Sequence, residues 1–234
     1  MMDSIFINAA KLLLDGKSEI FEIVMLSIYV TSSAVLISCV TIMPISALIS
    51  IKKFFGKKLI IIFVNSLMAL PPVVVGLVLY LLISARGPLS AYDLLYTPSA
   101  MVIAQIIILS PIIMSLTIQT IDNVLNIYDE FFDSLGLTIS QRIRTLLWES
   151  RMSLTINAIT GIGRGLSEVG AVIIVGGNIA HQTRVMTTTI AMETSRGDLE
   201  LALSVGIALI FLSIIINILL YLLKSSSKFR VSDV

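Results

Sequence analysis

The segment that decides the fold is IYDEFFDSLGLTISQRIRTLLWESR, residues 127–151. It carries charges of both signs and stands between long apolar runs that precede and follow it. Its pattern predicts two short helices, over 127–135 and 138–151, with Gly136 in the turn because glycine has no Cβ to hinder a tight reversal. A polar helix pair between apolar runs is expected at one surface of a bilayer, where a soluble protein can contact it.

The chain as a whole is too apolar for an ordinary soluble domain. Its 234 residues have a mean hydropathy of +1.00, and 13% of them are charged, whereas soluble domains carry about 25%. Several apolar runs exceed roughly 18 residues, the length at which a membrane-spanning helix is the default interpretation. The net charge of +1 gives no electrostatic reason to expect nucleic-acid binding. The sequence therefore predicts an all-α transmembrane protein.

The apolar runs predict about five spanning helices within a membrane domain over 20–223. An amphipathic helix at the membrane interface is expected over 1–19, a polar loop over 122–153 and a cytoplasmic tail over 224–234. Prolines inside the runs remove backbone donors, so bends are expected in the second and third spans. The five spans are 21–51, 59–84, 98–121, 154–177 and 199–223, and the bending prolines are Pro71, Pro72 and Pro111.

Basic residues predict which ends of the spans face the cytoplasm. Ten Lys and Arg residues fall on one side of the membrane and five on the other, while Arg164 falls inside the fourth span. The positive-inside rule places the richer side, with the loop 122–153 and the C-terminus, in the cytoplasm and the N-terminus outside. The ten are Lys52, Lys53, Lys57, Lys58, Arg142, Arg144, Arg151, Lys224, Lys228 and Arg230, and the five are Lys11, Lys17, Arg86, Arg184 and Arg196.

Residues of the polar loop resemble the EAA loop of ATP-binding-cassette (ABC) permeases. That pattern is Glu-Ala-Ala, three residues, Gly, nine residues, then Ile-x-Leu-Pro, and Glu130 and Gly136 match it. The match is partial, because Phe131 and Phe132 replace the alanines. The resemblance implies that this loop couples the spans to a separate ATPase subunit. Three further departures stand at the end of the pattern, where Leu146, Trp148 and Glu149 replace Ile, Leu and Pro.

Within this coupling loop, four neighbouring residues have a physical role in the expected contact. Phe131 and Phe132 offer apolar surface for a groove, which is a common way to bind a helix. Glu130 and Asp133 add charge for a basic partner. The alternative is a solvated amphipathic hairpin that has no partner.

The segment GIGRGLSEVGAVIIVGGNIAHQTRVMTTTIAMETSRGDLELAL, residues 161–203, resembles the permease subunit of tungstate ABC importers, relatives of the molybdate permeases. LMALPPVVVGLVLYLL (67–82), RGPL (86–89) and TPSAMVIAQ (97–105) support the resemblance, which covers about 20–223. It implies a type I importer fold in the cell membrane and a homodimer of this subunit. It also implies two cytoplasmic subunits that bind ATP and Mg, and an extracytoplasmic tungstate-binding protein that delivers the oxyanion.

Candidate residues for a translocation pathway or gate follow the polar loop. Arg164 and Glu168, four apart, are expected on one face of the fourth span, because a charge at mid-membrane must face protein or water. An internal ion pair that only fixes helix packing is the alternative. Flexible backbone after the span offers N–H groups to an anion, and polar side chains follow it. The full set is Arg164, Glu168, Gly176, Gly177, Asn178, Thr183 and Arg184.

Other functions are disfavoured because the sequence lacks residues that their chemistry would need. Gly16-Lys17-Ser18 resembles the end of a phosphate-binding loop, but Lys11 stands where its first glycine is required. The chain is therefore expected to be no enzyme and to bind no cofactor or metal. His181 has no cluster of metal ligands around it. A stand-alone channel or secondary carrier, an intramembrane enzyme, and molybdate or sulfate as the transported ion remain the alternatives.

Overall fold

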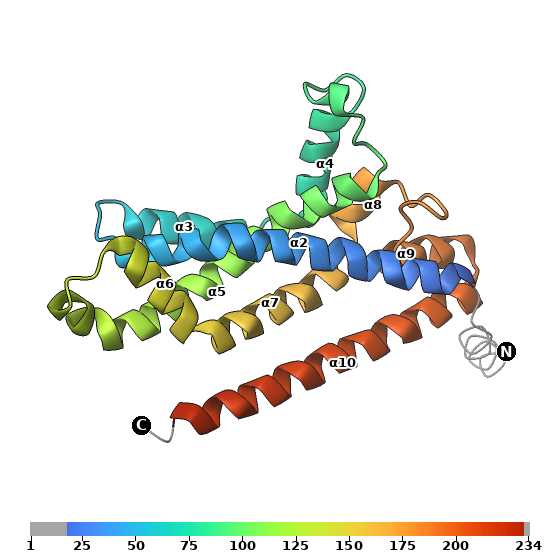
Figure 1. Ribbon diagram of the computed structural model, residues 1–234. Helices are drawn as coiled ribbons and strands as arrows, with labels where there is room; N and C mark the ends of the chain where they lie inside the picture. The colour runs from blue at the N-terminus through green and yellow to red at the C-terminus, as the bar shows by residue number, and fades with distance from the viewer. Residues whose placement is uncertain (1–17, 232–234) are drawn as a thin grey trace. The chain divides into compact units, whose positions relative to one another are not determined.

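The protein is all-helical in the computed structural model, which describes residues 18–231 (Figure 1). The expected interfacial helix over 1–19 falls almost wholly outside these residues. Every regular element within 18–231 is helical, which confirms the predicted all-α class. The elements are α2 (Ser18–Ile51), α3 (Lys57–Leu67), α4 (Pro72–Ile83), η1 (Ser90–Tyr92), α5 (Pro98–Ser134), α6 (Ile139–Glu149), α7 (Arg151–Leu166), α8 (Gly170–Gly176), α9 (Met186–Arg196) and α10 (Leu199–Val231).

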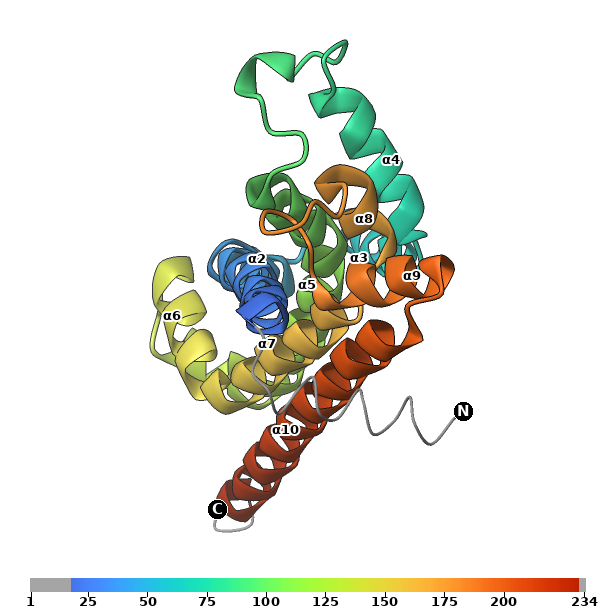
Figure 2. The same ribbon diagram turned by 90° about the vertical axis from the view of Figure 1, so that its right-hand side faces the viewer.

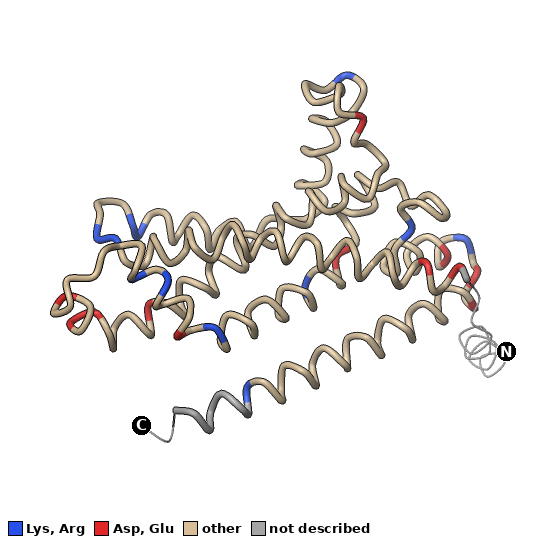
Figure 3. Tube along the Cα trace, viewed as in Figure 1, with Lys and Arg blue, Asp and Glu red and all other residues tan. Residues whose placement is uncertain are grey.

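Three helices in the described part of the chain are long and apolar enough to cross a membrane. They are Glu19–Ile51, Pro98–Ser134 and Leu199–Lys224. Two pairs of shorter helices, α3 with α4 and α7 with α8, raise the number to five if each pair forms one broken span. The charges lie mainly at helix ends and in loops, and long stretches of α2 and α10 carry none (Figure 3).

The chain divides into two compact units, each built from segments that are far apart in sequence. Helices α2, α5, α7 and α10 contribute residues to both units, whereas α4, α8 and α9 belong to unit 1 and α3 and α6 to unit 2. The described residues are 18–34, 71–105 and 163–217 in unit 1, and 35–70, 106–162 and 218–231 in unit 2.

The prolines act differently at the two places where bends were expected. The second apolar run is interrupted, because α3 ends at Leu67 and α4 begins at Pro72. Pro71 is extended with ψ 121°, and Pro72 occupies the first turn of α4, where its missing N–H needs no partner. In contrast, α5 continues as one helix through Pro111 to Ser134. The first helix expected in the polar loop, 127–135, is therefore the end of α5 and not a separate helix.

The fourth apolar run also departs from a single helix. It comprises α7, a break at residues 167–169, and the short α8. The polar segment 178–198, between the fourth and fifth expected spans, contains helix α9 (Met186–Arg196).

Within unit 1, α4 packs directly against α8 (Figure 2). The two backbones approach so closely that a Cβ at Gly76 would lie 2.7 Å from the Ala171 Cα. A Cβ at Gly170 would lie 2.6 Å from a methyl group of Val73. Small residues of this kind allow the close helix contacts that are typical of membrane proteins. This packing positions α8, and several candidate pathway residues lie at its end or directly after it.

Candidate functional site

The turn between α5 and α6 has a defined backbone geometry. Gly136 adopts a φ of +62°, a left-handed conformation that favours glycine. Helix α6 then begins with a capping box in which the Thr138 N–H donates to Gln141 Oε1 at 2.8 Å and the Gln141 N–H donates to Thr138 Oγ1 at 3.5 Å. The end of α5 and the start of α6 are thus held in one arrangement.

Ion pairs within unit 2 reinforce this turn. Arg142 Nη2 donates to Asp133 at 2.6 Å, and Arg142 Nε donates to the Leu137 carbonyl at 3.1 Å. The Asp129 carboxylate lies 3.6 Å from Arg142 Nη1 and 3.5 Å from Lys53 Nζ. Asp133 was predicted to offer its charge to a basic partner protein. Its carboxylate instead binds Arg142 of the same chain, so its first role is to tie α6 to α5.

Phe132 also differs from its predicted role as a contact surface. Its side chain is only 1% exposed and lies in a core with Ala47, Ile121 and Leu146. Its ring stacks on Tyr128 with centroids 5.9 Å apart. The buried ring is not available to a partner, and it holds the end of α5 against α2 and α6.

Phe131, in contrast, is exposed and belongs to an apolar stripe on the last turns of α5 and on Leu135, the residue after it, whose N–H still donates to the Phe131 carbonyl at 3.2 Å. Ile127, Phe131 and Leu135 follow one another at intervals of four residues, which places them on one helix face. Their exposed fractions are 75%, 56% and 56%. Glu130 beside them is exposed as well. We call Ile127, Phe131 and Leu135 the exposed stripe, a contiguous apolar surface of the kind that marks a contact with another protein.

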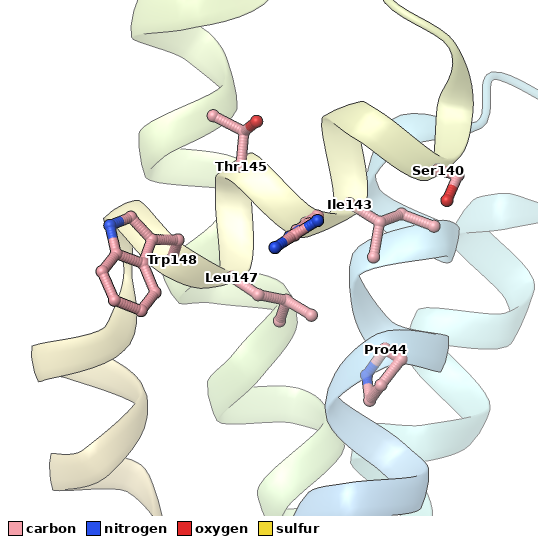
Figure 4. A pocket seen from close by; sticks show the side chains of 7 residues that line it. Pro44, Ser140, Ile143, Thr145, Leu147 and Trp148 are labelled. Carbon is pink, nitrogen blue, oxygen red and sulfur yellow. The ribbon is translucent and has the colours of Figure 1, made fainter.

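An open groove lies next to α6, on the side that faces Pro44 of α2 (Figure 4). It has a volume of about 820 Å³. Both of its walls, α6 and the part of α2 around Pro44, belong to unit 2. Its opening is wide, so it is a surface groove and not an enclosed substrate cavity. The lining residues are Pro44, Ser140, Ile143, Arg144, Thr145, Leu147 and Trp148.

In unit 1, most of the predicted pathway residues after α8 are engaged in internal contacts. The Asn178 side chain is buried, and its Oδ1 accepts a hydrogen bond from Thr188 Oγ1 at 2.8 Å. Thr183 is also buried, donates to the Gly176 carbonyl and accepts the Ile179 N–H at 3.0 Å. These side chains fold the segment between α8 and α9 and have no free donor to offer an anion.

Gly176 and Gly177 are surrounded closely as well. A Cβ at Gly176 would lie 2.9 Å from the Met101 sulfur, and one at Gly177 would lie 2.6 Å from the Tyr96 ring. The backbone there is packed against α5 and the preceding loop. It is not a loose chain whose N–H groups point into open space.

Two ion pairs connect the segment between α8 and α9 to the start of α2. Arg184 Nη1 donates to Glu19 at 3.0 Å, and His181 Nδ1 lies 2.7 Å from Glu22 Oε2. The Arg184 side chain is largely buried, while the His181 and Glu22 side chains are exposed. Arg184 was predicted as a pathway residue, but its charge is already paired within unit 1.

Arg164 and Glu168 do not share a helix face, contrary to the sequence prediction. Helix α7 ends at Leu166, so the four-residue spacing no longer places the two side chains one turn apart. Glu168 is buried, and its Oε1 accepts the Ala171 N–H at 3.2 Å at the start of α8. Arg164 is exposed, and among the described residues no carboxylate pairs with it.

The buried polar residues around Glu168 enclose a void of only about 10 Å³. A void of that size has room for at most one water molecule. Gln105 Nε2 donates to the Gly165 carbonyl at 3.1 Å, but Gln105 Oε1 has no partner in the described structure. The cluster therefore holds helices together and is too small to admit an oxyanion. Its polar members are Ser27, Thr31, Gln105, Glu168 and Thr187.

Replacing Thr188 with valine should lower the free energy of unfolding by about 1–3 kcal/mol, because the buried Asn178 oxygen loses its donor and the Val185 N–H loses its acceptor at the start of α9. Thr189 is the matched control: it is equally buried, but its hydroxyl donates only to the Val185 carbonyl of its own helix, at 2.7 Å. Thr189→Val should cost much less. Denaturant unfolding of both variants in detergent measures the difference, and equal losses would contradict the role given to Thr188.

Comparisons with known proteins identify the family of this chain. No family model matches it. It is 39% identical over 219 residues, 94% of this chain and 96% of the relative, to the "Tungstate uptake system permease protein TupB" of Peptoclostridium acidaminophilum. The chain belongs to the family of tungstate and anion ABC permeases. A "Probable anion ABC transporter permease protein" of Haloferax volcanii is 33% identical to it, over 85% of this chain and 88% of the relative.

A third relative of this permease is the "Tungstate uptake system permease protein TupB" of Campylobacter jejuni, 34% identical over 74% of this chain and 72% of that protein. The sequence-based recognition of the family is thereby confirmed. The relatives are transport subunits, and an ABC permease acts in a complex with ATPase and binding-protein partners. The apolar helices agree with a multi-pass membrane protein.

Several residues that organise this permease were missed by sequence reasoning. Arg142 was counted only as a topological charge, although opposite charges at 133 and 142 flank the Gly136 turn. Polar side chains inside apolar runs also pair across helices of unit 2, as when Ser115 donates to Asn65 at 2.8 Å. In the same unit Asn157 donates to Thr120 at 3.0 Å. Isolated polar residues in a span were the available signal, because they need partners there.

Proposed function

We propose that this permease is the membrane-spanning subunit of a tungstate importer, and that two copies assemble with two ATP-binding subunits and a tungstate-binding protein. The observation that carries the proposal is the exposed stripe beside a turn of fixed geometry. A separate ATPase subunit can bind such an exposed apolar surface and move the membrane helix that carries it. The substrate follows from the names of two relatives, both tungstate uptake permeases.

Helix α5 can carry the motion of the ATPase subunit into the membrane, because it is continuous. Ile127 and Phe131 of the exposed stripe lie on the last turns of α5, and α5 runs without interruption from Pro98 to Ser134. A displacement applied to Phe131 is therefore applied to a candidate membrane span. Arg142 and Phe132 link the same turn to α6 and α2. ATP and Mg belong to the partner subunits in this proposal, and this chain supplies no catalytic group.

The orientation in the membrane follows from the charges. Lys53 and Lys57 form ion pairs with Asp129 and Asp122 in unit 2, so the basic loop 52–58 and the end of α5 share one surface. The positive-inside rule assigns this surface to the cytoplasm, where ATP is available. The N-terminus is then outside and the C-terminus inside.

The assembled complex should hydrolyse ATP faster when its binding protein carries the transported oxyanion. We expect tungstate to give the strongest stimulation in proteoliposomes, with a parallel uptake of tungstate. Equal or stronger stimulation by molybdate or sulfate would change the substrate assignment. Uptake by this chain alone, without ATPase subunits, would contradict the importer mechanism and favour a channel or secondary carrier.

A further inference from the structure

Helix α7 differs from the other candidate spans in the residues that it exposes. The exposed positions of α10 are mainly apolar, such as Ile210, Phe211 and Ile214, although Asn217 is exposed as well. Those of α4 include the apolar Val73 and Leu77. Such faces suit contact with lipid tails. Every exposed side chain from 151 to 167 is instead polar. These side chains are Thr155, Thr160, Arg164 and Ser167.

Thr160, Arg164 and Ser167 follow one another at intervals of four and three residues and therefore share one side of the helix, whereas Thr155, nine residues before Arg164, lies on the opposite side. Polar side chains on the outside of a span indicate that the side with Arg164 meets water or protein and not lipid. An arginine that faces hydrocarbon is costly, so Arg164 is expected in a wet or protein-lined setting. In sequence, Arg164 stands near the middle of the broken span, 13 residues after Arg151 and 12 before Gly176.

Arg164 is the side chain on this face that can donate hydrogen bonds to an anion, because the hydroxyl groups beside it already use their hydrogens within the helix. Thr160 and Ser167 each donate to the carbonyl four residues earlier in the chain, at distances of 2.8 and 3.0 Å. Their oxygens then face outward mainly as acceptors. A guanidinium has five N–H donors in a planar fork that matches two oxygens of a tetrahedral oxyanion.

We infer that Arg164 contacts the oxyanion during translocation, in a water-filled pathway that passes the last turn of α7. The other charged candidates in unit 1 are less suited, since Arg184 is largely buried and pairs with Glu19 through Nη1, and the Glu168 carboxylate accepts the Ala171 N–H at the start of α8. Arg164 alone among the predicted pathway residues is both cationic and exposed, with no carboxylate partner in the described chain. This inference rests on the proposed function and assigns the substrate-binding group within it.

The transport test replaces Arg164 with glutamine and with lysine in the reconstituted complex. We expect R164Q to reduce tungstate uptake by about tenfold to a hundredfold through loss of a charge-assisted hydrogen bond. ATP hydrolysis stimulated by the tungstate-loaded binding protein should persist, because the coupling loop is unchanged. R164K keeps the charge and should recover part of the uptake. R86Q, which removes an exposed arginine of the loop 85–97, is the control for loss of charge in unit 1.

An accessibility test separates a wet pathway from a protein contact. In a C39S background, R164C should react with the water-soluble cation methanethiosulfonate-ethyltrimethylammonium, and saturating tungstate should slow the reaction. The added positive charge should restore part of the uptake, whereas the anionic ethylsulfonate reagent should not. I214C on the apolar face of α10 is the matched control and should not react.

Each outcome bears on Arg164 separately from the importer itself. Normal uptake by R164Q, or R164C that never reacts in any nucleotide state, would overturn the inference. Loss of ATPase stimulation together with uptake in R164Q would assign Arg164 a structural role and also overturn it. Failure of the wild-type complex to transport tungstate would instead count against the proposed function, whatever the labelling of R164C shows.

Discussion

Replacing Phe131 with serine should abolish most tungstate uptake while leaving the permease folded. The ring is exposed at the centre of the exposed stripe, so its loss removes little from the core. An aromatic group that anchors an interface contributes at least about 2 kcal/mol of binding, which corresponds to a loss of affinity of about thirtyfold. Co-purification of the ATPase subunit with F131S and ATP-driven uptake in proteoliposomes measure the effect.

Phe132→Ala is the matched control, because it removes the same ring one residue along the chain. That ring is buried against Ala47 and Leu146, so its removal should lower the free energy of unfolding by about 3–5 kcal/mol. F131S should show an unfolding midpoint close to that of the wild type. Wild-type uptake by F131S, or equal destabilisation by the two variants, would contradict the assignment of the exposed stripe as the contact.

The sequence predicted the turn at Gly136 because a local conformational requirement leaves a local signal. It could not predict which of two adjacent phenylalanines is buried. On a helix, neighbouring residues point about 100° apart, and only the packing of α2 and α6 determines which of them faces the core. The end of α5 was misjudged for a related reason. Hydropathy marks where a span leaves the lipid, whereas the helix itself continues in water to Ser134.

The spans illustrate the same distinction between composition and geometry. An apolar run predicts a crossing, but α7 and α8 form one run with a break at 167–169, and no proline marks that break. Glu168 is the reason available in the structure, because its buried carboxylate accepts the Ala171 N–H and so begins a new helix. The contacts of Asn178 and Thr183 are likewise tertiary, which is why sequence analysis assigned these residues to a pathway and the structure shows internal hydrogen bonds.

Replacing Gly76 with alanine should destabilise the permease, because Gly76 lies where α4 contacts α8. In an isolated helix this change would stabilise by about 1 kcal/mol, because alanine is the better helix former. In unit 1 the new methyl group would lie 2.7 Å from the Ala171 Cα and 3.1 Å from its carbonyl oxygen. Backbone atoms cannot move aside as a flexible side chain can, so the two helices must separate. We expect a net loss of stability of about 1–3 kcal/mol or more.

Gly163→Ala is the matched control for this change, because Gly163 is also a helical glycine of unit 1. A Cβ there would lie 3.8 Å from an Ile216 methyl group, an ordinary van der Waals distance. G163A should therefore match or slightly exceed the wild type in thermal stability in detergent, whereas G76A should unfold at a clearly lower temperature. Because α8 carries the start of the segment that Asn178 and Thr183 fold, G76A should also lose uptake. An unchanged midpoint in G76A would show that the two backbones do not meet as described.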